Sequence, residues 1–352
     1  MLGRRLKLAR TAAGLSLREL ETKIGNIVSA QAIGKYERNE MMPGSKVLAA
    51  IAEALGVSEN YLTAQPDISL EGIEFRRNRI TSKREEAQVE AAVMSFLEKY
   101  LEIETILQVP SLEWEEPRQS LLYVADIVEG ELAAKTLREQ WNLGTDPILG
   151  LAEFLEEKGI KVLSLELPAS VSGLTCLVRR LNGNCVPVIV INTLDMGERQ
   201  RFTLAHEIGH MVLTVDQNVD EEKAAHRFAG AFLMPAELLR AEIGVHRKSL
   251  SLGELLVLKK MLGVSVQAIT YRCKDLGIIN QATYRALFEI FAKKGWRTPP
   301  YNEPDPIPKE APQRFKRLCF RALAEDAICE AKAAELLGMT VRRLNQEMET
   351  DC

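Results

Sequence analysis

The sequence has little that would place it in a membrane or in an oxidising compartment. Its longest apolar runs, such as VPVIVI at 186–191, have the length of a strand and fall far short of a bilayer span. No charged and apolar leader opens the chain, so we expect no secretion. The six cysteines are scattered and form no CxxC pair, which gives no sign of a disulfide framework. We therefore expect a cytoplasmic protein with reduced thiols and no membrane contact.

The sequence also lacks a strong excess of either charge. Its formal net charge is −4, which would argue against nucleic acid as a partner if the charge were spread evenly. Residues 1–65, however, hold nine Lys or Arg and six Asp or Glu, which gives this segment +3 and leaves −7 for the rest. A basic head on an acidic body predicts a single DNA-facing module.

The basic head reads as a series of short helices with clear stops. Gly14 ends the first helix, and Ser16 is placed to cap the second. Ser29 is placed to cap a third helix that runs to about Arg38. Ile33 and Tyr36 of this helix would face the core of the bundle, so the opposite side of the helix faces outward. The outward positions are Ala30, Gln31, Gly34, Lys35 and Arg38.

The SxxxIxxYExxxxxP pattern from Ser29 to Pro43 resembles the XRE-type helix-turn-helix family of phage repressors. The resemblance implies that the third helix enters the major groove of an operator, with Ser29, Gln31, Lys35 and Arg38 as DNA-binding residues. Many members carry Gln where this chain has Leu17, so their amide contact to the DNA backbone is not expected here. A small helical bundle used only for dimerisation or partner binding is the alternative for this module.

The order of helical patterns, strand patterns and linker segments predicts a mainly α, multidomain protein. An all-α DNA-binding bundle at 1–65 is followed by a linker with some extended structure and a helical connector at 66–125. Residues 126–245 read as an α+β zincin-like domain, in which helices precede a small sheet built from IKVLSLEL, SGLTCLVRR and PVIVIN. Residues 246–352 read as a helical region interrupted by a proline-rich loop at 295–312, which we expect to be an exposed loop or arm.

Histidine is scarce, and two of the four histidines lie at 206 and 210 around a glutamate. Four residues make about one helical turn, so both imidazoles leave the same face of a helix and can share a metal ion. Glu207 lies about 100° around the helix, where it can reach a water on the metal rather than the metal itself. A zinc site with Glu207 as the general base is the chemistry that this spacing predicts.

A third protein ligand is expected from the acidic helix that follows. Ala225, Ala229 and Phe232 define its inward stripe, and Glu222 lies on the same face near the helix start. Glu221 aligns less well, although an error of one residue in phase would reverse the choice. His226 is the other candidate ligand, and it could instead orient a ligand or stabilise an oxyanion.

The segments RQRFTLAHEIGH and EKAAHRFAGAFLMP, with PVIVIN upstream, resemble the ImmA/IrrE (M78-type) peptidases. The resemblance implies zinc ligation by His206, His210 and Glu222, with Glu207 as general base. In that family a separate peptidase typically relieves repression by cutting an XRE-type repressor. Here the repressor-like head lies on the same chain, as in fused regulators of this kind, and His226 stands where many relatives carry Asn.

The same helix corner occurs three times, in EALGVSENYL, KMLGVSVQAI and ELLGMTVRRL. Each has a glycine C-cap followed by a hydroxyl N-cap. The first copy comes after the expected DNA-reading helix, so the motif indicates a corner and not groove binding. A second DNA contact is left open by the basic residues near the later copies, which are Lys259, Lys260, Arg272, Arg342 and Arg343.

Three functions remain after these steps. The first is a DNA-binding regulator, expected to be a homodimer, whose zinc endopeptidase relieves repression by cutting itself or a partner protein. The second is an antitoxin-like DNA-binding regulator whose zinc domain senses or docks a partner, such as a toxin, without proteolysis. The third is a protease whose head only dimerises it. An intact Glu207 favours proteolysis, because a purely structural zinc site needs no general base.

Overall fold

The computed structural model describes residues 2–63, 68–77, 82–114, 117, 122–180 and 185–350. Their contacts divide the chain into two compact units. The first holds Met1–Glu113, Cys176–Val188 and Gln313–Cys352, and the second holds Trp114–Thr175 and Ile189–Pro312. Helices predominate in both, which confirms the mainly α prediction. No helix in the described part of the chain is long and apolar enough to cross a membrane.

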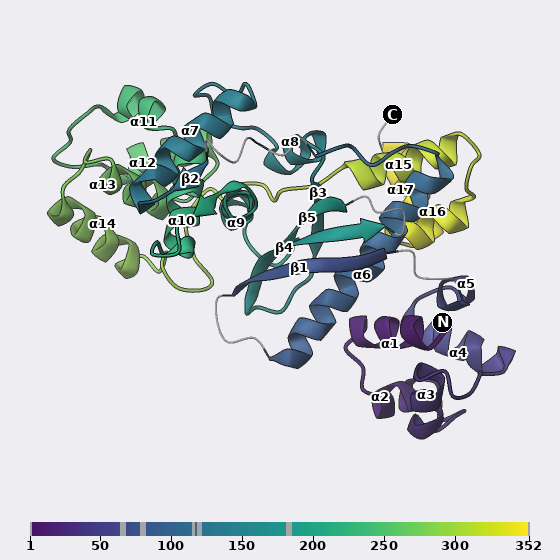
Figure 1. The fold of residues 1–352 in the computed structure, drawn as a ribbon. Helices are drawn as coiled ribbons and strands as arrows, with labels where there is room; N and C mark the ends of the chain where they lie inside the picture. The colour runs from purple at the N-terminus through teal and green to yellow at the C-terminus, as the bar shows by residue number, and fades with distance from the viewer. Residues whose placement is uncertain are drawn as a thin grey trace. The chain divides into compact units, whose positions relative to one another are not determined.

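The head of the first unit is a bundle of five short helices around its own core (Figure 1). They are α1 (Leu2–Ala12), α2 (Leu17–Lys23), α3 (Ala30–Glu37), α4 (Ser45–Leu55) and α5 (Glu59–Thr63). Ser16 and Ser29 are the N-caps of α2 and α3, as predicted, and each hydroxyl accepts a bond from a backbone N–H three residues on. The fully buried core side chains include Leu20, Ile33, Ile51 and Leu62.

A long helix, α6 (Lys83–Ile106), supports this head and begins in a capping box at Ser82. It packs against α1 and buries Val89, Val93 and Leu97. Arg5 on α1 forms a 2.7 Å ion pair with Glu98 on α6, and both side chains are more than nine-tenths buried. The Arg5 guanidinium also lies 4.8 Å above the Tyr61 ring. The bundle is thus tied to α6 by a buried polar contact as well as by apolar packing.

Three C-terminal helices complete the first unit: α15 (Arg314–Ala324), α16 (Glu330–Leu337) and α17 (Val341–Thr350). Phe315 on α15 packs against Phe96 and Tyr100 of α6, with ring centroids 5.0 and 5.2 Å apart. Between α16 and α17, Gly338 adopts a left-handed conformation with φ of 66°. Thr340 Oγ1 accepts a bond from the backbone N–H of Arg343. This is the corner geometry that the repeated motif predicts.

The second unit is an α+β assembly followed by a helical region. Its elements in chain order are β2 (Tyr123–Val124), η2 (Ile127–Glu129), α7 (Gly130–Gln140), α8 (Leu151–Glu157), β3 (Lys161–Leu165), β4 (Val171–Arg180), β5 (Cys185–Asn192), α9 (Gly197–Val212), β6 (Thr214–Val215), α10 (Glu221–Leu233), α11 (Ala236–Ile243), α12 (Leu252–Leu262), α13 (Val266–Asp275) and α14 (Gln281–Lys293). The helices and strands predicted between 125 and 192 are all present. β4 and β5 also contribute residues to the first unit.

The main sheet has four strands in the order β1-β4-β5-β3, where β1 spans Ile68–Arg77. β1 comes from the segment that the sequence marks as a linker with some extended structure, and nothing in its pattern predicted a place in this sheet. β5 reads as a continuous apolar run because seven of its eight residues are buried. A second, two-stranded sheet pairs β2 with β6 in parallel, with Tyr123 opposite Thr214 and Val124 opposite Val215.

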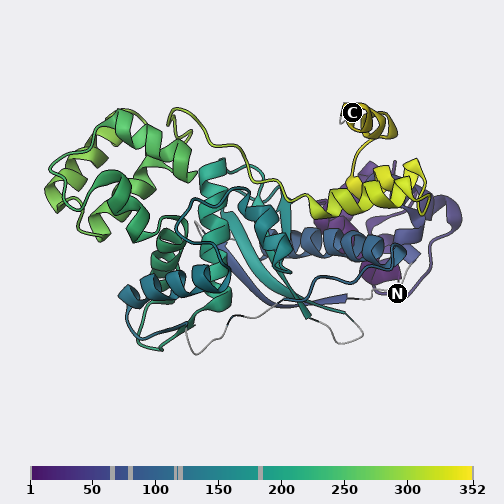
Figure 2. The ribbon, with the colours of Figure 1, turned by 90° about the horizontal axis from the view of Figure 1, so that it is seen from above.

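Helices α9 and α10 form the centre of the second unit and lie side by side in both views (Figures 1 and 2). Leu204 and Ile208 of α9 and Phe228 and Phe232 of α10 are fully buried in one core. Gly209 permits this close approach, because a Cβ at that position would lie 3.2 Å from the Phe228 ring. The helix that carries the two histidines is therefore locked against the acidic helix after it.

The proline-rich segment 297–312, here called the strap, has no helix or strand (Figure 2). Eleven of its sixteen residues are exposed, as its composition predicts, but Glu303 and Glu310 are only 8% and 7% exposed. Each buried carboxylate meets a buried cation of the same unit. Glu303 pairs with Lys259 on α12, and Glu310 pairs with Arg201 on α9. These ion pairs offset the cost of burying the charges and bind the strap to the second unit.

Candidate metal centre and nucleic-acid interface

The two histidines of α9 converge as their spacing predicts. His206 is completely buried and His210 is partly exposed. Their Nε2 atoms lie 3.0 Å apart, and their ring centroids are separated by 4.7 Å. Two imidazole nitrogens this close, on successive turns of one helix, can bind the same metal ion.

Glu222, in the first turn of α10, brings a carboxylate to the same point. Its Oε2 lies 3.3 Å from His206 Nε2, and its Oε1 lies 3.4 Å from His210 Nε2. Asp220 caps α10 by accepting a bond from the Lys223 N–H, which fixes the helix start. The ligand atoms of the two histidines and Glu222 all lie within 4.8 Å of one another.

The neighbouring acid, Glu221, faces a different atom. Its Oε1 lies 3.2 Å from Nδ1 of His210, the ring nitrogen turned away from the cluster. A carboxylate in that place fixes the tautomer and orientation of a metal-bound imidazole. The geometry therefore favours Glu222 over Glu221 as the third ligand. His226 borders the cluster, with its ring centroid 4.7 Å from that of His206 and 5.3 Å from that of Phe202.

Two imidazoles and one carboxylate are a donor set that suits zinc in a catalytic site, where a further position stays open. Glu207 follows His206 in α9 and is only 1% exposed. Strand β4 passes close to it at Gly173. A Cβ on Gly173 would lie 2.6 Å from Thr203 Cγ2, 2.7 Å from the Val190 carbonyl oxygen and 3.9 Å from Glu207 Oε1. Sequence reasoning missed Gly173, which only close packing reveals.

The predicted DNA-reading residues lie together on α3. Gln31, Lys35 and Arg38 are exposed along one side of the helix, and Ser29 is exposed at its N-cap. Gly34 was expected to face outward but is buried, and a Cβ at this position would lie 3.3 Å from Arg38 Nη1 and 3.5 Å from Leu17 Cδ1. Arg38 makes a two-pronged contact to Glu40, at 2.7 and 2.9 Å, so this cation is partly neutralised.

Comparison with protein-family models matches both regions. Residues 6–62 match the helix-turn-helix family, and residues 155–274 match the IrrE N-terminal-like domain of the M78 peptidases. The chain is a fusion of these two domains. No significant match was found among curated proteins or solved structures. The helix-turn-helix domain and the M78-type domain together make the chain a DNA-binding regulator with a protease-like domain.

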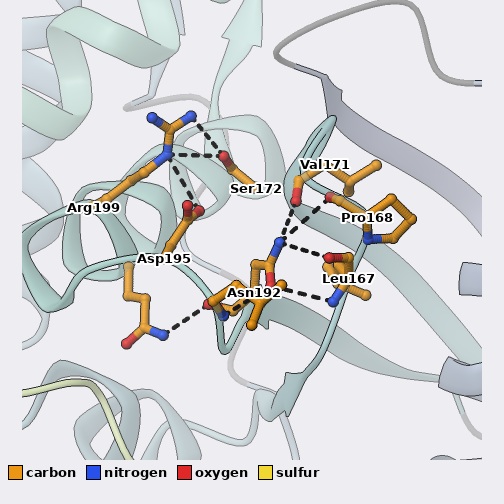
Figure 3. A network of polar contacts seen from close by, with 9 residues as sticks. Leu167, Pro168, Val171, Ser172, Asn192, Asp195 and Arg199 are labelled. Carbon is orange, nitrogen blue, oxygen red and sulfur yellow. Dashed lines mark hydrogen bonds and ion pairs between the residues drawn. The ribbon is translucent and has the colours of Figure 1, made fainter. Parts of the chain in front are cut away.

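In the M78-type domain, a polar network fixes the start of α9 (Figure 3). The side-chain amide of Asn192, at the end of β5, donates to the carbonyls of Leu167 and Val171 at 3.1 and 2.9 Å. Gln200 on α9 donates to the Asn192 carbonyl oxygen at 2.8 Å. The network sets where the helix leaves the sheet, and therefore where its histidines point.

The strap holds the same end of α9 from another direction. Glu310 accepts bonds from Arg201 and from the Ala152 N–H at 2.6 and 2.8 Å. At Gly197 a Cβ would fall 2.3 Å from the carbonyl oxygens of Ile307 and Pro308, so only glycine lets the strap lie this close. The first turn of α9 is thus fixed by the sheet and by the strap.

The other face of α10 is held by an ionic clamp. Arg227 pairs with Glu131 on α7 and with Asp275 on α13, at 3.0 and 3.1 Å. Glu131 also accepts from both terminal nitrogens of Arg272. Burial alone would raise the pKa of Glu131, but the Arg272 and Arg227 contacts outweigh it and lower this pKa below its ordinary value. The clamp sets the rotation of the helix that carries Glu222.

Proposed function

We propose that the chain is a transcriptional regulator that binds an operator through α3 and carries a zinc-dependent endopeptidase, which relieves repression by cutting this chain or a partner protein. The supporting observation is the convergence of His206, His210 and Glu222 beside the buried Glu207, on the same polypeptide as a helix-turn-helix domain. Proteolysis would make the switch irreversible, whereas release by a ligand would not.

The side chains divide the proposed reaction among them. His206, His210 and Glu222 would hold zinc, and Glu221 would orient the ring of His210 through Nδ1. Bound zinc supplies a Lewis acid that polarises a carbonyl and lowers the pKa of water. Glu207 would accept the proton of the attacking water and pass it to the leaving amine. His226, exposed at the edge of the cluster, would stabilise negative charge that develops on the substrate carbonyl.

The head would recognise the operator sequence. Gln31 can read a base edge with its amide, and Lys35 can reach guanine or phosphate oxygens. Ser29 lies at the N-terminal end of α3, where helices of this type approach the groove. Operators of helix-turn-helix proteins are usually paired half-sites, so we propose that the chain binds DNA as a homodimer.

DNA binding is tested with the promoter region of the chain's own gene. Gln31→Ala combined with Lys35→Ala should abolish specific binding, while Lys7→Ala, an exposed cation on α1, should change it little. Electrophoretic mobility shifts at several salt concentrations give the comparison. Unchanged binding by the double variant would show that α3 is not the reading helix.

Proteolysis is tested by incubating the zinc-loaded protein with itself and with candidate partner proteins, including any small toxin encoded beside it. Fragments that appear with the wild type and not with Glu207→Gln would support the peptidase. If the proteins in every mixture stay intact while zinc is bound, the peptidase proposal fails. The antitoxin-like alternative, in which the zinc domain docks or senses a partner, then replaces it. Mass spectrometry of the mixtures identifies the cut bond.

A further inference from the structure

The open face of α9 extends beyond the metal cluster. Between Gly197 and His210, all residues of this helix are buried except Arg199, Phe202 and His210. At about 100° per residue, Arg199 lies about 20° around the helix from His206, and Phe202 and His210 each lie about 40° from it. Up to His210, the accessible positions of α9 therefore lie on one stripe on the His206 side of the helix, with His210 at one end and Arg199 at the other.

Arg199 is held in place on this stripe. Its Nε and Nη2 donate to the hydroxyl of Ser172 on β4 at 3.0 and 2.8 Å, and Asp195 lies 3.2 Å from Nε (Figure 3). Ser172 is buried, whereas the Arg199 side chain is 35% exposed. The guanidinium thus has a fixed direction and still reaches solvent.

The contacts use one edge of the guanidinium and leave the other. Ser172 occupies the edge formed by Nε and Nη2. Within the described residues, no hydrogen bond or ion pair reaches Nη1, which points away from Ser172 and Asp195 in Figure 3. The end formed by Nη1 and Nη2 has the geometry that pairs with both oxygens of a carboxylate.

We propose that Arg199 is a specificity-determining residue that binds a substrate carboxylate, so that the M78-type domain prefers acidic peptides; this rests on the proposed peptidase function. Seven residues of helix place Arg199 about 10 Å along α9 from His206. An extended peptide covers that length in about three residues. The acidic residue should therefore lie about three positions from the bond that is cut, on one side only.

The test uses the zinc-loaded full chain and a synthetic peptide pool with randomised positions, whose products are read by mass spectrometry. Asp and Glu should be enriched about tenfold over Asn and Gln at one position near the cut bond. Arg199→Gln should abolish this enrichment, and Arg199→Lys should restore part of it. Arg240→Gln, which removes an exposed cation on α11, is the matched control and should keep the preference.

A purely structural role for Arg199 is separated by a pair of peptides that carry Asp or Asn at the enriched position. Arg199→Gln should raise KM for the Asp peptide about tenfold with kcat unchanged, and should leave the Asn peptide unaffected. Equal losses on both peptides would overturn the inference, as would cleavage without acidic preference. No cleavage that depends on Glu207 would instead overturn the proposed peptidase, and this inference with it.

Discussion

At the scale of single residues, the metal cluster is defined by which nitrogen each carboxylate faces. Glu222 faces Nε2 of both histidines, and Glu221 faces only Nδ1 of His210. We expect Glu222→Gln to lose zinc. Glu221→Gln, the same chemical change one residue away, should keep zinc with an affinity lowered about tenfold or more, the range typical of residues that orient a ligand. Competition with a chelator measures both; equal losses would contradict the assignment.

The absence of a side chain at Gly173 lets β4 pass close to Thr203 and Glu207 of α9. Gly173→Ala should lower the free energy of unfolding of the second unit by about 1–3 kcal/mol, because the new methyl overlaps Thr203 and the Val190 carbonyl oxygen. Gly253→Ala is the control, since a Cβ there meets nothing within 4 Å and alanine favours its helix. Urea unfolding of both variants gives the comparison; a harmless Gly173→Ala would mean that β4 moves freely away from α9.

At the scale of elements, the strap is an integral part of the second unit. Lys259 has no exposed surface and lies between Glu198 and Glu303, at 2.6 and 2.8 Å. Glu303→Gln should cost about 3 kcal/mol, because it removes one partner of a buried charge. It should also open the strap to limited proteolysis. Asp305→Asn, the same change at an exposed strap position, should do neither. Equal protease resistance in both variants would show that the pairing does not hold the strap.

The clamp on α10 predicts a dependence of stability on pH. Its arginines lower the pKa of Glu131, so the carboxylate stabilises the fold above the ordinary pKa of 4.5 and loses this effect as the pH falls through the lowered value. Glu131→Gln should therefore be less stable than the wild type at pH 7, and the difference should shrink as the pH falls below 4.5 and through the lowered pKa of Glu131. Thermal unfolding against pH measures it, with the exposed Glu139→Gln as control. A constant difference would contradict the assignment.

Elements of this chain could be predicted where the signal is local. Helix periodicity predicted α9, and the inward stripe of α10 predicted that Glu222 faces the two histidines, where the structure has it. The path of the strap could not be predicted. Its proline-rich composition excludes regular structure but does not show which buried cation pairs with Glu303. Gly34 was misplaced for a similar reason, since helical phase shows the direction of a position and not the neighbouring side chains, here Arg38 and Leu17, that lie over it. Pairings between distant segments leave little trace in a single sequence.

At the scale of the whole molecule, charge separates the two functions. Residues 1–65 carry +3 while the rest of the chain carries −7, so attraction to DNA should come from the head alone. The apparent DNA affinity should fall with salt, and Lys35→Ala should reduce the slope of that dependence by about one. Arg240→Ala, which removes an exposed cation in the M78-type domain, should leave the slope unchanged. If Arg240→Ala reduced the slope as much as Lys35→Ala, the body of the protein would also contact DNA, and the head would not act alone in operator binding.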